Sequence, residues 1–394
     1  MKDEEKSVSL RDWFGLRREN WILDPRNNIE DRKFYASRPN SINIEREITS
    51  LEIELEAKLS PKKLYWGVYG SGKTHTLYKV LQELSERLDI QVAFVECPVL
   101  KKTSTFTELY NKTSDAMGME FTISILRDKM DRVVQEVGFR NPEIVERKLI
   151  EAMQDEDLGR ATYRFVTQQF DPMIIWRWLT ASGISPRERN ELRVTTDLVD
   201  ADPARLAAIL VTLGRFLYEE HGKSLVLVFD ELDRAKNLNP DSEVTFSTAL
   251  TRLTEPGQTY VSIFLAMSAP RVDQLPTFIT EPVRDRIGKE NIVEIPAMTS
   301  DDVEPFVKDL VQYVRDPKVD VSEKIKIAKR ETNEDISEDF YPFTKDAIEA
   351  IKSACGTMIV PRSICRYMSK SAAYAKIRGK MCVTKKDVES AVGL

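Results

Sequence analysis

Short apolar runs alternate along this chain with longer stretches of helical spacing, a pattern typical of an α/β protein. Five apolar runs have the length of buried strands, and the first two lead into residues whose apolar positions recur every three or four places. Strands that alternate with helices pair in parallel and are covered on both faces. We therefore predict a parallel sheet with helices on both faces, whose strands are residues 64–69, 91–97, 225–229, 260–267 and 291–295.

An almost wholly helical region separates the second predicted strand from the third. It covers about residues 119–221 and is broken by four prolines, so we predict an inserted helical block. A second helical region follows Pro296 and predicts a C-terminal lid, interrupted by a charged stretch at 316–339. The predicted helices outside the block are 42–59, 74–87, 107–117, 300–314, 344–353, 361–377 and 385–392.

These patterns divide the chain into three parts. We predict an N-terminal arm at 1–40, a central α/β domain at 41–298 that contains the inserted block, and the helical lid at 299–394. A chain of 394 residues with 42% hydrophobic residues can bury a large core beside a smaller helical unit.

Charge and cysteine usage narrow the class of protein. The net charge of −6 gives no global basic surface, so any contact with nucleic acid must be local, for example at 101–102 or 376–386. Four cysteines without a CxxC pair and two histidines predict neither a disulfide framework nor a zinc site. The N-terminus lacks the apolar stretch of a signal peptide and no apolar run has membrane-spanning length, so we expect a cytoplasmic protein.

The strongest chemical signal is the segment Gly67-Val68-Tyr69-Gly70-Ser71-Gly72-Lys73-Thr74. It matches G-x-x-x-x-G-K-[ST] and lies between an apolar strand and a helix, where the backbone N–H groups of a glycine turn and the helix dipole bind a phosphate. We expect ATP here, with Lys73 at the β and γ phosphates and Thr74 on Mg²⁺. The predicted nucleotide contacts in this segment are Gly67, Gly70, Ser71, Gly72, Lys73, Thr74 and Thr76.

A pair of carboxylates, Asp230 and Glu231, follows the apolar strand at 225–229. The carboxyl edge of a parallel sheet is where nucleotides bind in such folds. Asp230 would hold Mg²⁺ and Glu231 would orient and deprotonate the attacking water. A solvated acidic turn is the alternative, but the acidic pair together with the phosphate loop favours ATP hydrolysis over binding alone.

Three further residues are candidates by position. Ser268 ends the strand at 260–267 and could hold the water or the γ phosphate, although a serine at the start of a loop is common. Arg286 could be donated by a neighbouring subunit to the developing charge on the γ phosphate, or could be a solvated arginine at a helix end. Arg362 opens a helix after Pro361 and could reach the phosphates from the lid, or pair with an acidic neighbour. His75 reads as a helix-face residue and not as a catalytic base.

With these elements in this order, the chain resembles AAA+ ATPases over about residues 40–394. The resemblance implies that 67–74 is Walker A and that Asp230 and Glu231 form Walker B. It also implies that Ser268 is sensor 1, Arg286 the arginine finger and Arg362 sensor 2. Members of this family assemble into rings or helical filaments with ATP between subunits, so the resemblance implies a homo-oligomer.

Two more specific likenesses concern the setting. Residues 97–110 and 229–234 resemble the origin-recognition initiators and the related transposon target-selection ATPases, although initiators usually append a winged-helix domain that we do not expect after residue 394. The inserted block, at 178–183, 192–199 and 204–218, resembles the ATP-binding proteins of BREX-type phage-defence systems.

Two functional hypotheses follow. The first is an AAA+ ATPase whose ATP-dependent assembly acts on DNA or on a DNA-bound partner, in a defence, mobile-element or replication setting. The second is an ATP-switched signalling protein that recruits an effector protein and does not bind DNA. An apolar exposed face on the inserted block would favour a protein partner, and a basic one would favour nucleic acid.

Overall fold

The computed structural model describes residues 8–36, 42–138, 141–168, 171–257, 260–332 and 336–393. The chain forms two compact units. The first unit contains Met1–Ile44, Gly67–Gln82 and Glu294–Leu394, and the second contains Glu45–Trp66 and Glu83–Val293. Residues 1–7 and 37–40 of the predicted arm lie outside the described residues, and the three-part division at residues 40 and 298 stays a prediction.

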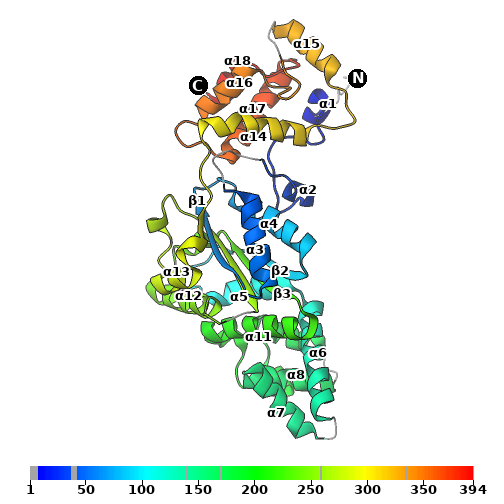
Figure 1. The fold of residues 1–394 in the computed structure, drawn as a ribbon, viewed down its shortest axis with the longest axis vertical. Helices are drawn as coiled ribbons and strands as arrows, with labels where there is room; N and C mark the ends of the chain where they lie inside the picture. Colours follow the sequence, from blue (N-terminus) through cyan, green and yellow to red (C-terminus); the bar gives the residue numbers. More distant parts are fainter. Residues whose placement is uncertain are drawn as a thin grey trace, which may run out of the picture. The chain divides into compact units, whose positions relative to one another are not determined.

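The second unit is built on a five-stranded parallel sheet (Figure 1). The strand order is β2-β3-β4-β1-β5, which confirms the predicted α/β class. All five predicted strands are present, with ends displaced by at most two residues. The three central strands are apolar runs buried on both faces, and the two edge strands are only partly buried. The strands are β1 (Lys62–Gly67), β2 (Ile90–Glu96), β3 (Ser224–Asp230), β4 (Val261–Ser268) and β5 (Ile292–Glu294).

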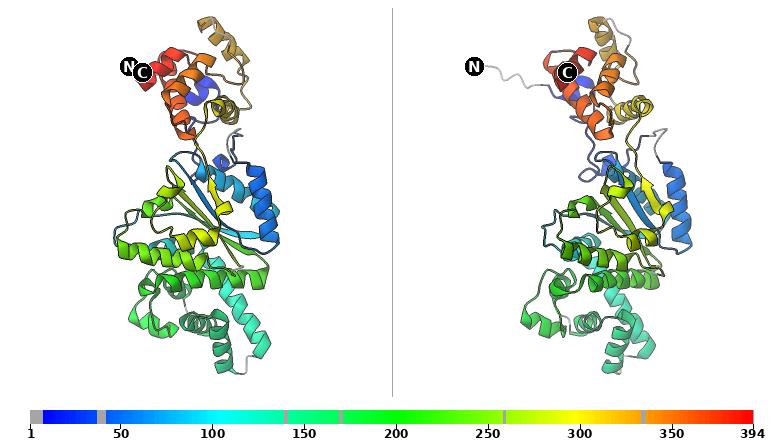
Figure 2. Two further views of the ribbon diagram at one scale, coloured as in Figure 1. Left: turned by 60° about the vertical axis from the view of Figure 1, so that its left-hand side comes forward. Right: turned by 90° about the vertical axis from the view of Figure 1, so that its left-hand side faces the viewer.

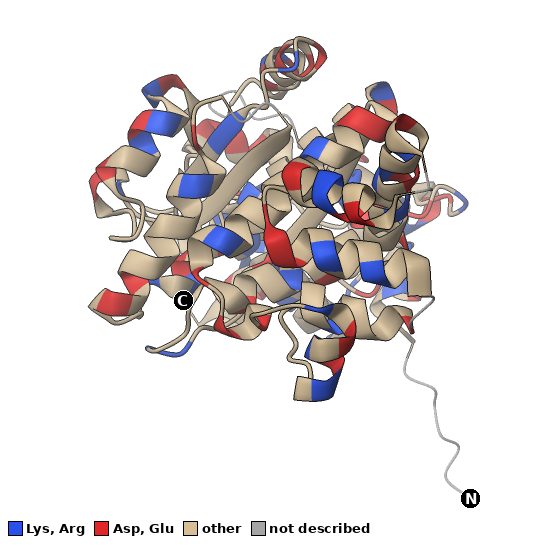
Figure 3. Ribbon diagram, turned by 90° about the horizontal axis from the view of Figure 1, so that it is seen from below, with Lys and Arg blue, Asp and Glu red and all other residues tan. Residues whose placement is uncertain are grey.

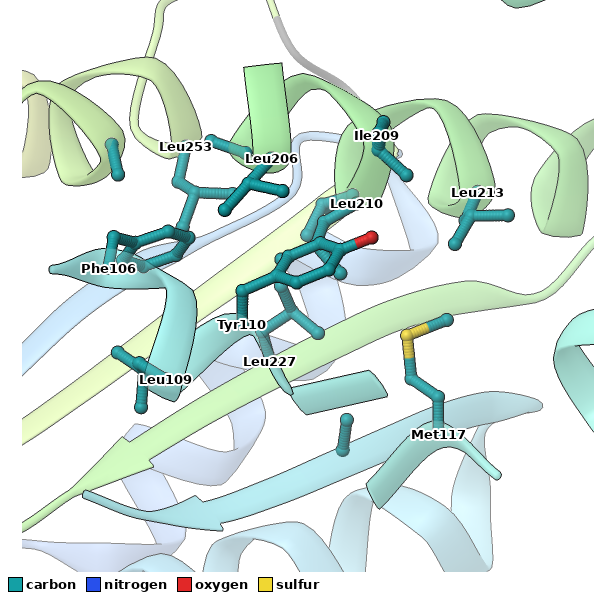
Figure 4. Packing of buried hydrophobic residues seen from close by; sticks show 14 of the residues in the cluster. Phe106, Leu109, Tyr110, Met117, Leu206, Ile209, Leu210, Leu213, Leu227 and Leu253 are labelled. Atoms are coloured by element: carbon teal, nitrogen blue, oxygen red, sulfur yellow. The ribbon is translucent and has the colours of Figure 1, made fainter. Parts of the chain in front are cut away.

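Alternate residues of each strand face two different layers of helices. Leu227 of β3 lies in the core beside α5 (Phe106–Met117) and α11 (Pro203–His221), as Figure 4 shows for Tyr110 and Leu210. On the other face, Tyr65 of β1 donates a hydrogen bond to Glu47 of α3 (Ile44–Glu56) over 2.7 Å. The two views in Figure 2 place α3 on the side of the sheet opposite α11. The remaining helices of this unit outside the inserted block are α12 (Pro240–Leu253) and α13 (Glu281–Ile287).

The predicted inserted block is helical between β2 and β3. Its helices before α11 are α6 (Met119–Val137), α7 (Pro142–Met153), α8 (Glu156–Gln168), α9 (Pro172–Leu179) and α10 (Pro186–Leu192). Trp178 is fully buried and its indole N–H donates to the Thr196 carbonyl over 3.0 Å, so this tryptophan packs the block. Arg205 at the start of α11 pairs with Asp155 at 2.6 Å and with the buried Asp157 at 3.0 Å, which ties the turn between α7 and α8 to α11.

The first unit contains the lid helices and, packed into them, the N-terminal arm. The ring of Trp21 lies 5.3 Å from that of Phe343, and Trp13 donates its indole N–H to the Lys380 carbonyl over 2.9 Å. Phe14 is also fully buried in this cluster. The helices of this unit are α1 (Leu10–Phe14), α2 (Ile29–Arg32), α14 (Ser300–Val314), α15 (Ser322–Thr332), α16 (Lys345–Ala354), α17 (Pro361–Ile377) and α18 (Lys385–Val392), and α4 (Lys73–Arg87) begins in it.

One expectation about the lid was wrong. The charged stretch at 316–339 was expected to interrupt the bundle, but it contains α15, which buries Ile325 and Ala328 in the lid core. Only these two residues of α15 are buried. Two buried residues are too few to give a helical period that can be recognised among the charged ones. Among the described helices of both units, none is both long and apolar enough to cross a membrane.

Candidate functional site

The phosphate loop follows β1 and leads into α4. A side chain at Gly67 would place its Cβ 2.2 Å from the carbonyl oxygen of Ile295, so only glycine fits at this close approach. Gly72 has a φ of +106°, a conformation that residues with a side chain rarely adopt. Apart from its two chain neighbours, no described residue lies within 4 Å of where its Cβ would be. The glycines therefore leave an open concave backbone at the start of a 15-residue helix.

Two polar side chains of this loop fit a phosphate ligand. Lys73 donates from Nζ to the carbonyl oxygens of Gly67 at 3.1 Å and Val68 at 3.0 Å, so its ammonium group lies over the loop. Ser71 is fully buried, and its hydroxyl has no hydrogen-bond partner among the described residues. A buried hydroxyl without a partner costs about 1–3 kcal/mol, and a bound phosphate oxygen would accept from it.

The next residues, at the start of α4, contact the N-terminal arm. Arg26 approaches the hydroxyl of Thr74, with 3.5 Å between Nη2 and Oγ1. Thr76 is buried and its backbone N–H donates to the Gly72 carbonyl over 2.9 Å. Thr74, the predicted magnesium ligand, is half-buried beside a guanidinium group, so a cation would have to displace Arg26 from it.

Arg362, at the N-terminus of α17, lies against the same loop. Its guanidinium carbon lies 4.7 Å from the centre of the Tyr69 ring. Its Nη1 donates a hydrogen bond to the Tyr69 hydroxyl. Its Cβ lies 3.1 Å from the position that a Cβ on Gly70 would occupy. The first unit thus brings the predicted lid arginine to the phosphate loop, held by a cation–π contact of about 0.5–2 kcal/mol.

In the second unit, the acidic pair lies at the carboxyl end of β3. Asp230 is 1% exposed and its carboxylate accepts the backbone N–H of Glu231 over 2.9 Å. Glu231 has a φ of +57°, in the left-handed region, which turns the chain sharply out of the strand. Such strain costs about 1–3 kcal/mol and is often found at functional sites.

Arg234 contacts the acidic pair and was not identified from the sequence. Its Nη2 pairs with Glu231 and lies 2.6 Å from Oε1 of Glu96, the last residue of β2. Its Nη1 donates to the Cys97 carbonyl over 3.0 Å. Burial raises the pKa of the Cys97 thiol to about 12, with the Arg234 guanidinium acting in the opposite direction, so this thiol is no nucleophile. The three-residue spacing from Glu231 is the signal that could have revealed Arg234.

Ser268 lies at the same edge of the sheet. It ends β4, which pairs with β3 in the register Phe229 opposite Leu265. Its backbone N–H donates to the Asp233 carboxylate over 2.8 Å. The second unit therefore brings the predicted residues Asp230, Glu231 and Ser268 to one edge, with Asp233 joining the two strand ends.

Arg286 lies elsewhere in this unit. Its Nη1 donates to the Thr251 carbonyl over 2.5 Å. Burial of Lys62 lowers the pKa of that lysine, and the nearby charge of Arg286 lowers it further. Lys62 is the first residue of β1, and in a parallel sheet the first residues lie at the edge opposite the last ones. The predicted finger is therefore not at the edge that holds Asp230 and Glu231.

No family model and no curated protein matches this chain. Among solved structures, it is 13% identical to the Aeropyrum pernix ORC1 protein in complex with DNA, with a TM-score of 0.46 over 92% of this chain and 66% of that one. Cdc6p from Pyrobaculum aerophilum is 14% identical, with a TM-score of 0.46 over 92% and 70%. Drosophila ORC bound to DNA is 12% identical, with a TM-score of 0.42 over 92% and 64%. This chain is similar to origin-recognition proteins. It spans about two thirds of their length.

His75, beside the phosphate loop, gives a pH-dependent prediction. Its Nε2 is buried and has no hydrogen-bond partner among the described residues. Burial lowers the pKa of His75 from 6.5 to about 4, against the opposite effect of Asp31 and Asp24. The His75 imidazole therefore binds a proton near pH 6.5 in the unfolded chain, but only near pH 4 in the folded chain. The contribution of the neutral imidazole to the free energy of unfolding is fully present above pH 6.5. It is lost as the pH falls from 6.5 to about 4, by at most about 3 kcal/mol.

Denaturant unfolding of the wild type and of His75→Gln between pH 7 and pH 4 measures this loss. We expect the wild type to lose up to about 3 kcal/mol more than the variant. Arg187→Gln, on the exposed surface of the inserted block, provides the control, because it leaves the buried imidazole in place and should follow the wild-type curve. Parallel curves for wild type and His75→Gln would show that burial does not depress this pKa.

Proposed function

We propose that this protein is an ATPase that binds Mg²⁺-ATP at the phosphate loop and hydrolyses it with the acidic pair. One observation carries the proposal: the loop leaves β1 and the acidic pair leaves β3 at the carboxyl edge of one parallel sheet, with β4 between the two strands. Strand ends at this edge of an open α/β sheet converge on bound nucleotides.

The residues divide the work by their chemistry. The loop N–H groups, Ser71 and Lys73 would hold the phosphates, and Arg362 would contact them from the lid. Thr74 and Asp230 would hold Mg²⁺, which neutralises phosphate charge when bound. Glu231 would accept the proton of the attacking water. Arg234, bonded to Glu231, would orient that carboxylate.

Two substitutions separate binding from hydrolysis. Lys73→Ala should abolish ATP binding, because the loop loses its cation. Glu231→Gln should keep ATP binding but slow turnover by about 10²-fold or more, because the amide cannot accept a proton. Fluorescent-nucleotide binding and phosphate release measure the two effects, with Arg187→Gln on the exposed surface of the inserted block as control. Normal turnover by Glu231→Gln would refute its assignment as the base.

We further propose that the ATP site is shared between subunits of a homo-oligomer. The motive is the AAA+ resemblance, which assigns Arg286 as a finger for a neighbouring subunit. Arg286 lies away from the acidic pair of its own unit, where it donates to the Thr251 carbonyl, so it would have to leave that carbonyl to serve a neighbour. Arg286→Ala should lower turnover about as much as Glu231→Gln does.

Mixing experiments test the shared site. A mixture of Arg286→Ala with Lys73→Ala protein should regain some turnover, because an intact phosphate loop then meets an intact arginine. A mixture of Glu231→Gln with Lys73→Ala should regain none, because both changes fall in the same half of the site. Equal activity of the two mixtures, with all variants folded, would exclude a finger donated across an interface.

We propose DNA, or a DNA-bound partner, as the target of ATP-dependent assembly, in a defence, mobile-element or replication setting. The alternative is an ATP-switched protein that recruits an effector. The inserted block does not distinguish a DNA target from a protein partner, because acidic and basic residues are interspersed along its helices (Figure 3). Many of these residues form ion pairs, such as Arg160 with Glu156. Support for DNA comes from residues 350–386 of the lid, which include nine Lys and Arg residues and no Asp or Glu.

Fluorescence anisotropy with labelled duplex DNA distinguishes these functions. We expect binding at about 100 mM salt that is tighter with ATP than without it, and tightest for Glu231→Gln with ATP, because that variant retains the triphosphate. Absence of nucleotide-dependent binding, in protein that hydrolyses ATP, would favour the effector-recruiting switch.

A further inference from the structure

The charge of the lid is strongly segregated along the sequence. Between Glu349 and Asp387 the chain has nine Lys and Arg residues and no Asp or Glu, although the whole chain has a net charge of −6. Acid-free segments of this length cannot neutralise their own cations, so the positive charge must be met by flanking residues, by solvent ions or by a ligand.

Flanking acids neutralise three of the nine. Lys352 pairs with Glu349 at 3.2 Å, Lys380 with Asp387 at 2.7 Å and Lys385 with Glu389 at 3.8 Å. The other six form no ion pair within the part of the chain that the structure describes. They are Arg362, Arg366, Lys370, Lys376, Arg378 and Lys386.

Three of these six follow one another along α17. Arg362, Arg366 and Lys370 are exposed and lie four residues apart. Four residues of helix advance about 6 Å and turn by about 40° beyond a full turn, so the three cations form a line about 12 Å long on one face. We call this line the α17 stripe. The opposite face of α17 is buried in the lid core through Ile364, Met368 and Ala372.

We propose that the α17 stripe binds the phosphate backbone of duplex DNA. The proposal rests on the function proposed above and names the surface that meets its target. Evenly spaced cations on a rigid helix contact phosphates without reading sequence, and each contact adds affinity by releasing a counterion.

The composition of the stripe face favours duplex DNA over other polyanions. Ala373 and the exposed Ile377 on this face are not aromatic. The two nearest rings, Tyr69 and Tyr374, each have an arginine of this chain over one face, Arg362 and Arg378. Single-stranded nucleic acid is held largely by stacking on free aromatic rings. The apolar face of α17 packs inside the lid core. A helix that binds an anionic membrane needs that face free to insert between lipids, so the membrane is the less suitable ligand.

The stripe also begins at the nucleotide site. Arg362 contacts Tyr69 and approaches Gly70 of the phosphate loop. Arg366 and Lys370 continue the line away from the loop along the same rigid helix. DNA on the stripe and ATP in the loop would therefore compete for, or share, one arginine, which would make DNA affinity depend on the nucleotide state.

A double substitution tests the stripe without touching the nucleotide contacts. Arg366→Gln with Lys370→Gln removes two exposed cations that pair with no acid among the described residues. The matched control, Arg147→Gln with Arg187→Gln, removes the same charge from the exposed surface of the inserted block. Binding of a labelled duplex of about 30 base pairs is measured with ATP between about 50 and 200 mM salt.

We expect the stripe variant to bind at least about tenfold more weakly and to lose about 1.8 from the slope of log affinity against log salt, as two lost phosphate contacts require. The control should bind like the wild type. A charge-conserving variant, Arg366→Lys with Lys370→Arg, should retain binding, which separates loss of charge from loss of fold.

Contrary results have distinct meanings. Wild type that binds DNA while the stripe variant binds equally well overturns the stripe and leaves the proposed function standing. Wild type that hydrolyses ATP but binds no duplex overturns both the stripe and the DNA part of the function. Loss of binding in the charge-conserving variant overturns the stripe as a charge-based contact. Equal binding of a single-stranded oligonucleotide, or of vesicles containing phosphatidylserine, overturns the assignment to duplex DNA.

Discussion

The burial of β3 on both faces constrains everything at its carboxyl end. Residues Leu225 to Phe229 are completely buried, and an uncompensated charge among them would cost far more than the few kcal/mol by which domains are stable. A carboxylate can first appear where the strand ends, and there it needs a hydrogen-bond donor. Asp230 meets that need with the N–H of Glu231, and the left-handed turn at Glu231 then carries the chain out of the sheet.

The same constraint explains why much of the fold is readable from sequence. The apolar runs of the three central strands are buried on both faces, and a glycine turn between strand and helix leaves few alternatives for residues 67–74. The helices of the inserted block and most of the lid have enough apolar positions for their period to be recognised. Helix α15 does not, because Ile325 and Ala328 are its only buried residues.

Contacts between distant parts of the chain are what the sequence could not supply. Arg234 reaches Glu96 across 138 positions only because β2 and β3 pair in a register that places Glu96 opposite Asp230. The position of Arg286 close to Lys62 likewise depends on the strand order. The contact of Arg26 with Thr74 depends on where the N-terminal arm packs. Periodicity reports which face of an element is buried but not which element covers it.

The arm and the lid share one core although they come from opposite ends of the chain. Phe14 and Trp21 are buried among residues such as Phe343 and Met368, more than 300 positions away. At a synthesis rate of about 5–20 residues per second, the arm waits on the order of 20–70 seconds before its packing partners leave the ribosome. Throughout that time Phe14 and Trp21 lack the residues that bury them in the folded protein, so the nascent chain exposes an apolar segment that chaperones or the ribosome surface can bind.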